Sequence, residues 1–375
     1  MDGSRTVLLA AYAQSVAETD QFEIGNTAQI LQGLFGEVGG IMSTAKKHIR
    51  ERSEYSRFLH AAEEEFGDTL WYLAALCRRQ SITLDEIFRR AVSDGAFASV
   101  GAASDVLDSP FAAVARPVSS DTLDATLFRL GKSAANLLDD HVDLVALTAF
   151  ARHYLEALHS AKISFASVAT RNMRKTRGAF LAPVASELVD FDEAFGVDEQ
   201  LPRNFRIRIN QRSSGKSYLQ MNGVFIGDPL TDNISDKDGY RFHDVFHLAF
   251  AEILHWSPVF RALLKRKRKS HSSYDEEQDG GRAIVVEEGL TAWVFSCAKD
   301  LGFFAGQNKV PLGLLKTVGE FVSGFEASRC PLKLWERAIL DGFAVFREVK
   351  ATEGGWVIGN RGTRTLSYEP LESTT

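Results

Sequence analysis

Over most of the first 180 residues, apolar positions recur at intervals of three and four, which is the spacing of amphipathic helices. Two clear runs are Ile30, Leu31, Leu34, Phe35, Val38 and Ile41, and Leu70, Leu73, Leu76 and Cys77. The pattern stops at 94–120, a stretch rich in Ser, Ala, Asp and Pro that we expect to be a linker. It resumes from Leu123 to about Arg177. The first half is therefore predicted to be a helical bundle.

The pattern changes after residue 200. Polar and apolar residues alternate through NFRIRINQRSSGKSYLQMNGVFIGDP, around a Ser-Ser-Gly turn and an Asn-Gly pair, which predicts a β-hairpin. Helical periodicity returns between Gly239 and Leu264 and again over 283–300, 311–325 and 332–350, with extended character near Trp356–Ile358. We therefore expect a mainly α protein of two domains, a helical bundle at 1–185 and a mostly helical α+β domain at 200–375.

Residues 122–180 resemble a second copy of the first helical hairpin. Aligning LQGLFGEVGGIMSTAKKH with LFRLGKSAANLLDDH places Gly36 over Gly131 and Glu37 over Lys132. Two such hairpins would make a four-helix bundle, although amphipathic helices also match by chance. In this alignment Asp68 falls over Phe150, so a duplicate would have lost the acidic residues of the first copy.

Composition narrows the class of protein. With 375 residues, 45% of them hydrophobic, the chain can build two cores. Its formal net charge of -6 makes nucleic acid an unlikely partner for the whole chain. The basic run at 265–269 is expected to be a solvated loop, with a phosphate or RNA contact as the alternative. Three scattered cysteines fit a reducing cytoplasm. The sequence has no window of ~18 uncharged apolar residues, so we expect no membrane-spanning helix.

Acidic residues interrupt two of the apolar helical stretches. Glu65 and Asp68 are three apart, so both project from one helix face, with Glu64 beside them. Asp68 directly precedes the apolar segment TLWYLAAL, where an acid is costly to bury. If Glu37 lies opposite this pair, three carboxylates converge and repel one another unless a cation neutralises them. Mg²⁺ prefers such oxygen ligands and keeps several waters for a phosphate to displace.

The segments GLFGEVGG and EEEFGDTLWYLAAL resemble the all-helical nucleotide pyrophosphohydrolases of the MazG and dimeric dUTPase type. Their metal signature is ExxE, a spacer and ExxD, which Glu37, Glu65 and Asp68 match. The resemblance is strong over 25–92 and weak over 122–180. It implies Mg²⁺-dependent cleavage of a nucleoside triphosphate to a monophosphate and pyrophosphate, with Glu64 or Glu65 orienting or deprotonating the water. The chain departs from this signature at Gly40, where the family has the second Glu of ExxE.

Other residues are candidates for contacts with the substrate. The segment SFASVATRNMRKTRGAF resembles the closing helix of that family, where Asn172, Lys175 and Arg177 fit the substrate-proximal positions. Charge alone makes Lys46, Lys132, Lys175 and Arg177 candidates for phosphate contacts, with a solvated helix face as the alternative. Trp71 and Tyr72 are candidates for stacking on a base, with a place in the core as the alternative. The family resemblance also implies a homodimer, unless the internal duplicate replaces the partner.

The second half contains its own potential metal ligands. His243 and His247 are four apart on a helical stretch and share a face, as two metal ligands must. Glu287 and Glu288 follow in another apolar helix. Two histidines and a carboxylate favour Zn²⁺ or a similar ion. The alternative is a pair of hydrogen-bonded core histidines with Glu287 or Glu288 as partner.

Three functions follow from these patterns. The leading one is a pyrophosphohydrolase in the first half. Gly40 favours a non-catalytic nucleotide sensor fused to an effector domain. The histidines favour a metallohydrolase acting through His243 and His247.

Overall fold

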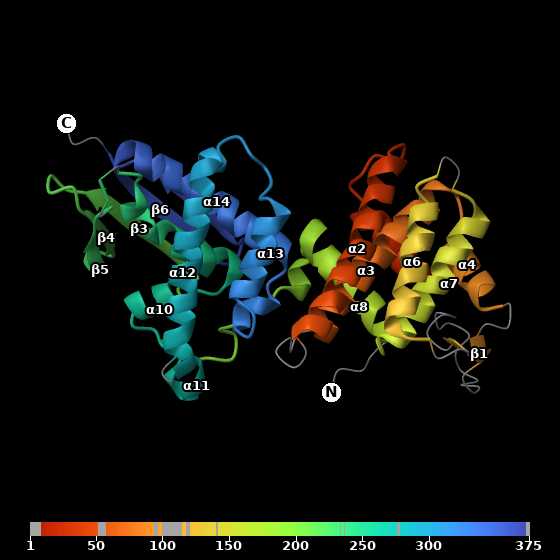
Figure 1. Cartoon of the computed structure of the whole chain (residues 1–375). Coiled ribbons are helices and arrows are strands. Elements are labelled where there is room, and N and C mark those ends of the chain that lie inside the picture. The colour runs from red at the N-terminus through yellow and green to blue at the C-terminus, as the bar shows by residue number, and fades with distance from the viewer. Residues whose placement is uncertain are drawn as a thin grey trace. The chain divides into compact units, whose positions relative to one another are not determined.

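The computed structural model describes residues 9–51, 58–93, 97–99, 115–117, 121–139, 142–232, 234–235, 237–275 and 278–372. The chain forms two compact units, residues 1–181 and 182–375, and each contains its own hydrophobic core (Figure 1). The boundary therefore lies a few residues before the expected one. As a result, residues 182–199 belong to the second unit, where the buried Asp192 pairs with Arg261 and Arg361.

The first unit is helical. Its helices are α1 (Leu9–Thr19), α2 (Thr27–Glu51), α3 (Phe58–Arg79), α4 (Leu84–Val92), α6 (Leu123–Asn136), α7 (Leu144–Ser160) and α8 (Phe165–Phe180). Helices α2 and α3 pack together, as do α6 and α7, and α2 also contacts α6. The sequence marks the helix starts: Thr122, Asp143 and Ser164 each accept a hydrogen bond from a backbone N–H of the first turn, the preferred chemistry of an N-cap.

In the first unit, the helix that follows each helical hairpin packs on the other hairpin. Helix α4, which follows the first hairpin, packs on α7 of the second. Helix α8, which follows the second hairpin, packs on α3 of the first. This reciprocal arrangement is what two copies of one hairpin-plus-helix unit would give, although the duplication itself stays a prediction. Most of the expected linker at 94–120 lies outside the described residues. Within it, β1 (Phe97–Ser99) pairs antiparallel with β2 (Ala115–Pro117).

The second unit is built on an antiparallel sheet of five strands in the order β5-β4-β3-β6-β7. The strands are β3 (Asn204–Gln211), β4 (Ser217–Met221), β5 (Val224–Leu230), β6 (Gly354–Asn360) and β7 (Thr365–Glu369). The hairpin prediction is confirmed at both turns: β3 and β4 flank Ser-Ser-Gly, and β4 and β5 flank Asn222 and Gly223. These two residues have φ of 49° and 81°, the left-handed conformation that two-residue hairpin turns require.

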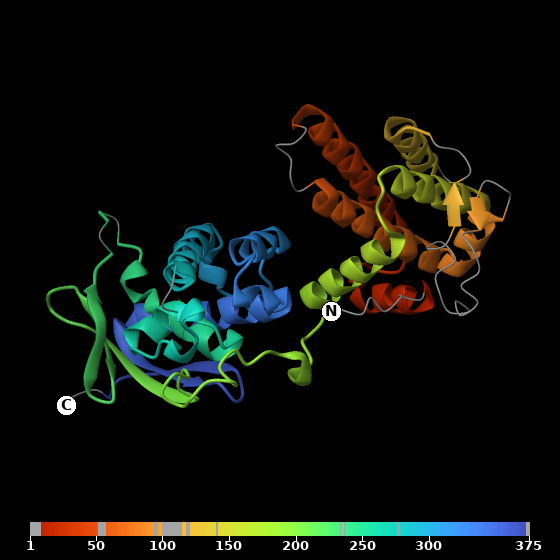
Figure 2. The ribbon, with the colours of Figure 1, turned by 90° about the horizontal axis from the view of Figure 1, so that it is seen from below.

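Helices cover one face of this sheet (Figure 2). They are α9 (Asp244–Ala249), α10 (Pro258–Leu263), α11 (Ser272–Asp275), α12 (Gln278–Asp300), α13 (Leu312–Phe321) and α14 (Leu332–Thr352). Helices α9 and α14 pack against β6 and β7, where Phe205, Ile207 and Ile209 of β3 turn alternate side chains into the core. The mainly α fold with an α+β second domain is confirmed. None of the described helices is long and apolar enough to cross a membrane.

The basic run at 265–269 is only partly a solvated loop. Arg268 is buried and pairs with Asp275 and Glu326 at 2.9 and 2.7 Å. Arg266 donates to the backbone carbonyls of Val197 and Gln200. The expectation of a fully solvated run was wrong for these two residues, because acids and carbonyls distant in the sequence come to lie against them.

Candidate functional site

The acidic residues of the first unit meet where α2 and α3 pack together. Glu37 comes from α2, and Glu64, Glu65 and Asp68 share one face of α3. The Glu65 carboxylate lies against Gly40 of α2, and Glu37 lies close enough to Glu65 and Asp68 for their charges to act on it. The two helices therefore place Glu37 near Glu65 and Asp68.

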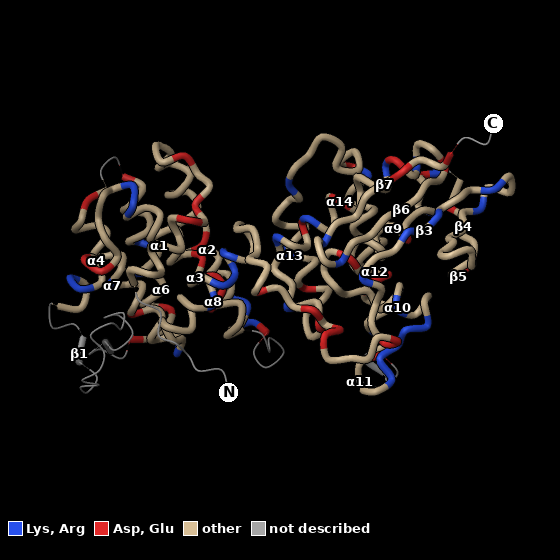
Figure 3. The backbone as a smooth tube through the Cα atoms, turned by 180° about the vertical axis from the view of Figure 1, so that it is seen from behind, with Lys and Arg blue, Asp and Glu red and all other residues tan. Residues whose placement is uncertain are grey.

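A lysine from a third helix, α8, joins the acidic cluster. Lys175 of α8 places its Nζ 2.7 Å from Glu64 Oε1 and 2.6 Å from Asp68 Oδ2. Asn172, one turn earlier, donates to Asp68 Oδ1 at 2.9 Å and accepts from the buried Tyr12 hydroxyl at 2.7 Å. Acidic residues of α3 and basic residues of α8 lie side by side (Figure 3). The position of Asp68 is thus set by two partners, a cation and an amide.

Acidic side chains predominate in the acidic cluster. Among the described residues, the carboxyl groups of Glu37, Glu65 and Asp68 lie around the ammonium group of Lys175, which also pairs with Glu64. Burial, together with the negative charges of Asp68 and Glu65, raises the pKa of Glu37 to about 8. Burial also raises the pKa of Glu65. Burial would lower the pKa of Lys175, but Asp68 and Glu64 raise it. The cluster therefore holds an extra proton near neutral pH and would gain from a further cation.

Gly40 lies directly under the Glu65 carboxylate. A Cβ atom built on Gly40 would come within 2.2 Å of Glu65 Oε2. At the position where the resembling family carries its second glutamate, this chain therefore has no side chain, and Glu65 occupies the space instead. Glu65 is thus placed to take over part of the missing ligand's position.

The two adjacent aromatic residues of α3, Trp71 and Tyr72, lie in different environments. Trp71 is buried, and its indole N–H donates to Thr19 Oγ1 at 3.0 Å, so the structure places it in the core. Tyr72 is half-buried, and the charges of Glu37 and Asp68 contribute to its raised pKa after burial itself. Of the two, Tyr72 is the one that faces the acidic cluster.

Three of the basic candidates do not meet the acidic cluster in the described residues. Lys46 is exposed and lines a separate cavity of about 360 Å³ with Met42, Ile49 and Phe128. Lys132 is exposed on α6. Arg177 pairs with Glu18 at 2.7 Å, and both side chains are well exposed. Lys175 and Asn172 are the predicted contacts that the fold brings to the acids.

The histidine cluster of the second unit is aligned by hydrogen bonds. His243 Nδ1 lies 2.9 Å from the Tyr240 carbonyl oxygen, and His247 Nδ1 lies 2.9 Å from Glu287 Oε1. A carbonyl or a carboxylate can only accept, so each Nδ1 carries a proton. Each Nε2 is then left with its lone pair whenever the ring is neutral.

Glu287 and Glu288, though neighbours in sequence, have different environments. Glu288 Oε2 lies 3.7 Å from His243 Nε2 and 3.5 Å from His247 Nε2. Glu287 is fully buried and accepts from His247, from Ser257 Oγ at 2.6 Å and from the Val259 N–H at 2.8 Å. Burial alone would lower the pKa of His247, but Glu287 and Glu288 raise it to about 10. Glu288 therefore faces both rings, whereas Glu287 orients one of them.

The two clusters differ in compactness. Within the part of the chain that the structure describes, one group of potential ligands has all its ligand atoms within 4.8 Å of one another: His243, His247 and Glu288. Glu37, Glu65 and Asp68 do not form such a group, and Asp68 is engaged by Lys175 and Asn172. Mg²⁺ keeps several waters and prefers oxygen ligands, so the charge and donor type of the acidic cluster fit that ion.

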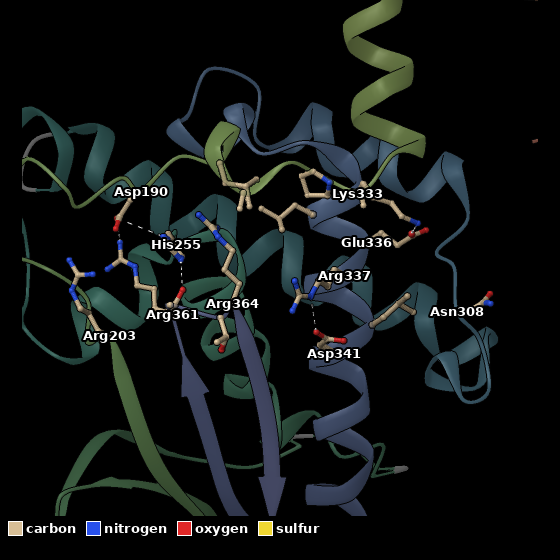
Figure 4. A pocket seen from close by; sticks show the side chains of 18 residues that line it. Asp190, Arg203, His255, Asn308, Lys333, Glu336, Arg337, Asp341, Arg361 and Arg364 are labelled. Carbon is tan, nitrogen blue, oxygen red and sulfur yellow. Dashed lines mark hydrogen bonds and ion pairs between the residues drawn. The ribbon is translucent and has the colours of Figure 1, made fainter. Parts of the chain in front are cut away.

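No pattern in the sequence pointed to a larger cavity in the second unit (Figure 4). It has a volume of about 660 Å³, and apolar and charged side chains both line it. These include Asp190, Arg203, His255, Lys333, Glu336, Arg337, Asp341, Arg361 and Arg364. Arg361 pairs with Asp190, Lys333 with Glu336, and Arg337 with Asp341. Much of its charge is therefore neutralised internally. The residues come from segments far apart in the chain and share no motif.

Comparison with known proteins places a family match in the second unit. Residues 186–372 match the family model described as the MazG C-terminal domain. The chain therefore carries a MazG-family domain, and this domain is the half for which the sequence analysis recognised no family. No curated protein and no solved structure matches the chain.

Proposed function

We propose that the first unit is a Mg²⁺-dependent nucleoside-triphosphate pyrophosphohydrolase. The observation that carries this proposal is the group of carboxyl side chains, Glu37, Glu65 and Asp68, that lies around Lys175 in the described part of the chain. The family match adds support, because a domain described as the C-terminal domain of MazG directly follows a unit whose motifs resemble MazG nucleotide hydrolases.

The chain's own residues would divide the work. Glu37, Glu65 and Asp68 would hold Mg²⁺, which neutralises triphosphate charge and lowers the pKa of a water. Lys175 lies between Glu64 and Asp68 at the edge of the cluster and would contact a phosphate oxygen there. Asn172, anchored by Tyr12, would keep Asp68 in position. Tyr72 would border the nucleotide, whereas Trp71 supports the helix from the core.

The reaction needs a group that accepts a proton from the attacking water. The water oxygen would bond to the α-phosphorus, the bond from that phosphorus to the bridging oxygen would break, and pyrophosphate would leave. Glu65 is a better acceptor than Glu64, because Lys175 already engages Glu64 and because burial raises the pKa of Glu65 toward neutrality.

The test is a panel of nucleoside triphosphates incubated with the full chain and Mg²⁺, with the products identified. We expect a monophosphate and pyrophosphate. Asp68→Ala should lower turnover by at least ~100-fold, since substitutions even in the surroundings of a metal ligand cost 10–100-fold. The variant should stay folded, although Lys175 and Asn172 each lose a partner. Asp85→Ala is the matched control, because Asp85 is an exposed acid in α4 that pairs with Arg89.

Two outcomes would contradict the proposal. Full activity in Asp68→Ala would remove Asp68 from the site. Nucleotide binding without any turnover would instead support the sensor function that Gly40 favours.

A further inference from the structure

We propose that His243, His247 and Glu288 bind one divalent transition-metal ion, with Zn²⁺ the first candidate, in the second unit. This site is separate from the acidic cluster of the first unit and does not depend on the function proposed for that cluster. Its ligands would be the Nε2 atoms of both histidines and one carboxylate oxygen of Glu288.

The spacing of these atoms suits a small ion. Two ligands that each lie ~2.0–2.1 Å from a tetrahedral ion are about 3.3–3.4 Å apart. Glu288 Oε2 lies 3.7 Å from His243 Nε2 and 3.5 Å from His247 Nε2, and all three ligand atoms fall within 4.8 Å of one another. Shifts of a few tenths of an ångström would bring the Glu288 carboxylate and each ring to the separation that two ligands of one tetrahedral ion have.

A buried donor atom points into the same place. His247 is completely buried, yet its Nε2 makes no hydrogen bond within the described part of the chain. A buried polar atom that is left unpaired is destabilising. A metal ion bonded to Nε2 would satisfy it.

The hydrogen bonds around the rings have the form that metal sites use. Ligating histidines usually donate their second ring N–H to a carboxylate or a backbone carbonyl, which fixes the tautomer and the ring orientation. Here the Nδ1 of His247 donates to Glu287, and that of His243 donates to the Tyr240 carbonyl. Glu287 is in turn fixed by Ser257 and Val259, and the Tyr240 ring stacks on His243 at 4.4 Å.

The donor set also predicts which ion binds. Two neutral imidazoles and one carboxylate favour Zn²⁺ and similar ions over Mg²⁺, which prefers oxygen ligands. Glu287 lies 2.9 Å from His247 Nδ1 and Glu288 lies 3.5 Å from its Nε2, so a carboxylate stands on either side of this ring. Three protein ligands leave one position open for water or another small oxygen donor, as in sites that act on a bound molecule.

The experiment uses the full chain without a histidine tag, stripped of metal and then titrated with Co²⁺ and Zn²⁺. We expect one equivalent of Co²⁺ to give the visible absorption of a low-coordinate site, and Zn²⁺ to displace it. Glu288→Ala and His243→Asn should each weaken Co²⁺ binding by more than ~10-fold. Excess Mg²⁺ should not abolish the signal.

Matched controls separate this site from others. Glu320→Ala and His271→Asn change exposed residues of the same unit and should leave Co²⁺ binding intact, as should Asp68→Ala in the acidic cluster. Glu288 is partly exposed, so Glu288→Ala decides the matter even if His243→Asn fails to fold. The proposal is wrong if the unaltered chain binds Co²⁺ no more tightly than Glu288→Ala.

Discussion

The acidic cluster of the first unit and the histidine cluster of the second differ in the groups that stabilise their buried polar side chains. In the acidic cluster, Lys175 supplies positive charge beside Asp68, and burial with the charges of Asp68 and Glu65 raises the pKa of Glu37 to about 8. In the histidine cluster, Glu287 and the Tyr240 carbonyl hold both rings with their Nε2 atoms toward Glu288. The first cluster is rich in charge, whereas the second is compact and aligned.

This difference follows from the kind of ion that each donor set suits. A hard ion such as Mg²⁺ keeps much of its water, so a protein needs only to collect negative charge near it. A transition ion bonds directly to nitrogen and oxygen at about 2.0–2.2 Å, so its ligands must be positioned in advance. The comparison predicts that the histidine cluster will be more sensitive to changes in surrounding residues than the acidic one.

Among changes to residues that are not themselves proposed ligands, the largest effect is expected for Glu287→Gln. A glutamine cannot accept from all three donors that Glu287 satisfies, because its amide nitrogen would face one of them. We expect Co²⁺ or Zn²⁺ affinity to fall by about 10–100-fold and the free energy of unfolding to fall by about 1–3 kcal/mol. Competition titration and urea unfolding measure both, with Glu320→Gln as control. Unchanged metal affinity would mean that Glu287 does not orient His247.

Mg²⁺ binding to the acidic cluster should release a proton. The pKa of Glu37 is raised to about 8, so at pH 7 the folded chain holds a proton that the unfolded chain has lost. The stability from that proton is full below pH ~4.5 and disappears as pH rises through about 8. A bound cation must displace it, so Mg²⁺ affinity should rise by up to ~10-fold per pH unit in that range.

Calorimetry in two buffers of different ionisation enthalpy measures the released proton. Glu37→Gln should remove the release. If the unaltered chain takes up Mg²⁺ with no proton release at pH 7, then Glu37 is not among the groups that the ion meets.

The smallest effect is expected for Gly40→Ala. The new Cβ would displace the Glu65 carboxylate, which can rotate away, so turnover should fall by only ~2–10-fold. Stability should hold or rise, since alanine is favoured over glycine within a helix by roughly 0.5–1 kcal/mol. Gly39→Ala is the control, because a Cβ there meets nothing within 4 Å. Equal turnover in the two variants would show that the position of Glu65 is not critical.

Local pattern was enough to predict much of the fold. The helical periodicity, the Asn-Gly turn and the alternation of β3 were all readable because each depends on neighbours within a few residues. The pairing of β3 with β6 was not predictable, because these strands are about 150 residues apart. The family match covers residues 186–372, whereas the resemblance found in the sequence lies in the first half.

The sequence by itself determined which residues are candidates for the chemistry, since Glu37, Glu65, Asp68, His243 and His247 stand out as polar residues in apolar helices. Only the tertiary structure decided their partners. It placed Lys175 on Asp68, separated the roles of Glu287 and Glu288, and buried Arg268. Helix periodicity fixes the direction of a side chain on its own helix, but the group it meets depends on packing between distant segments.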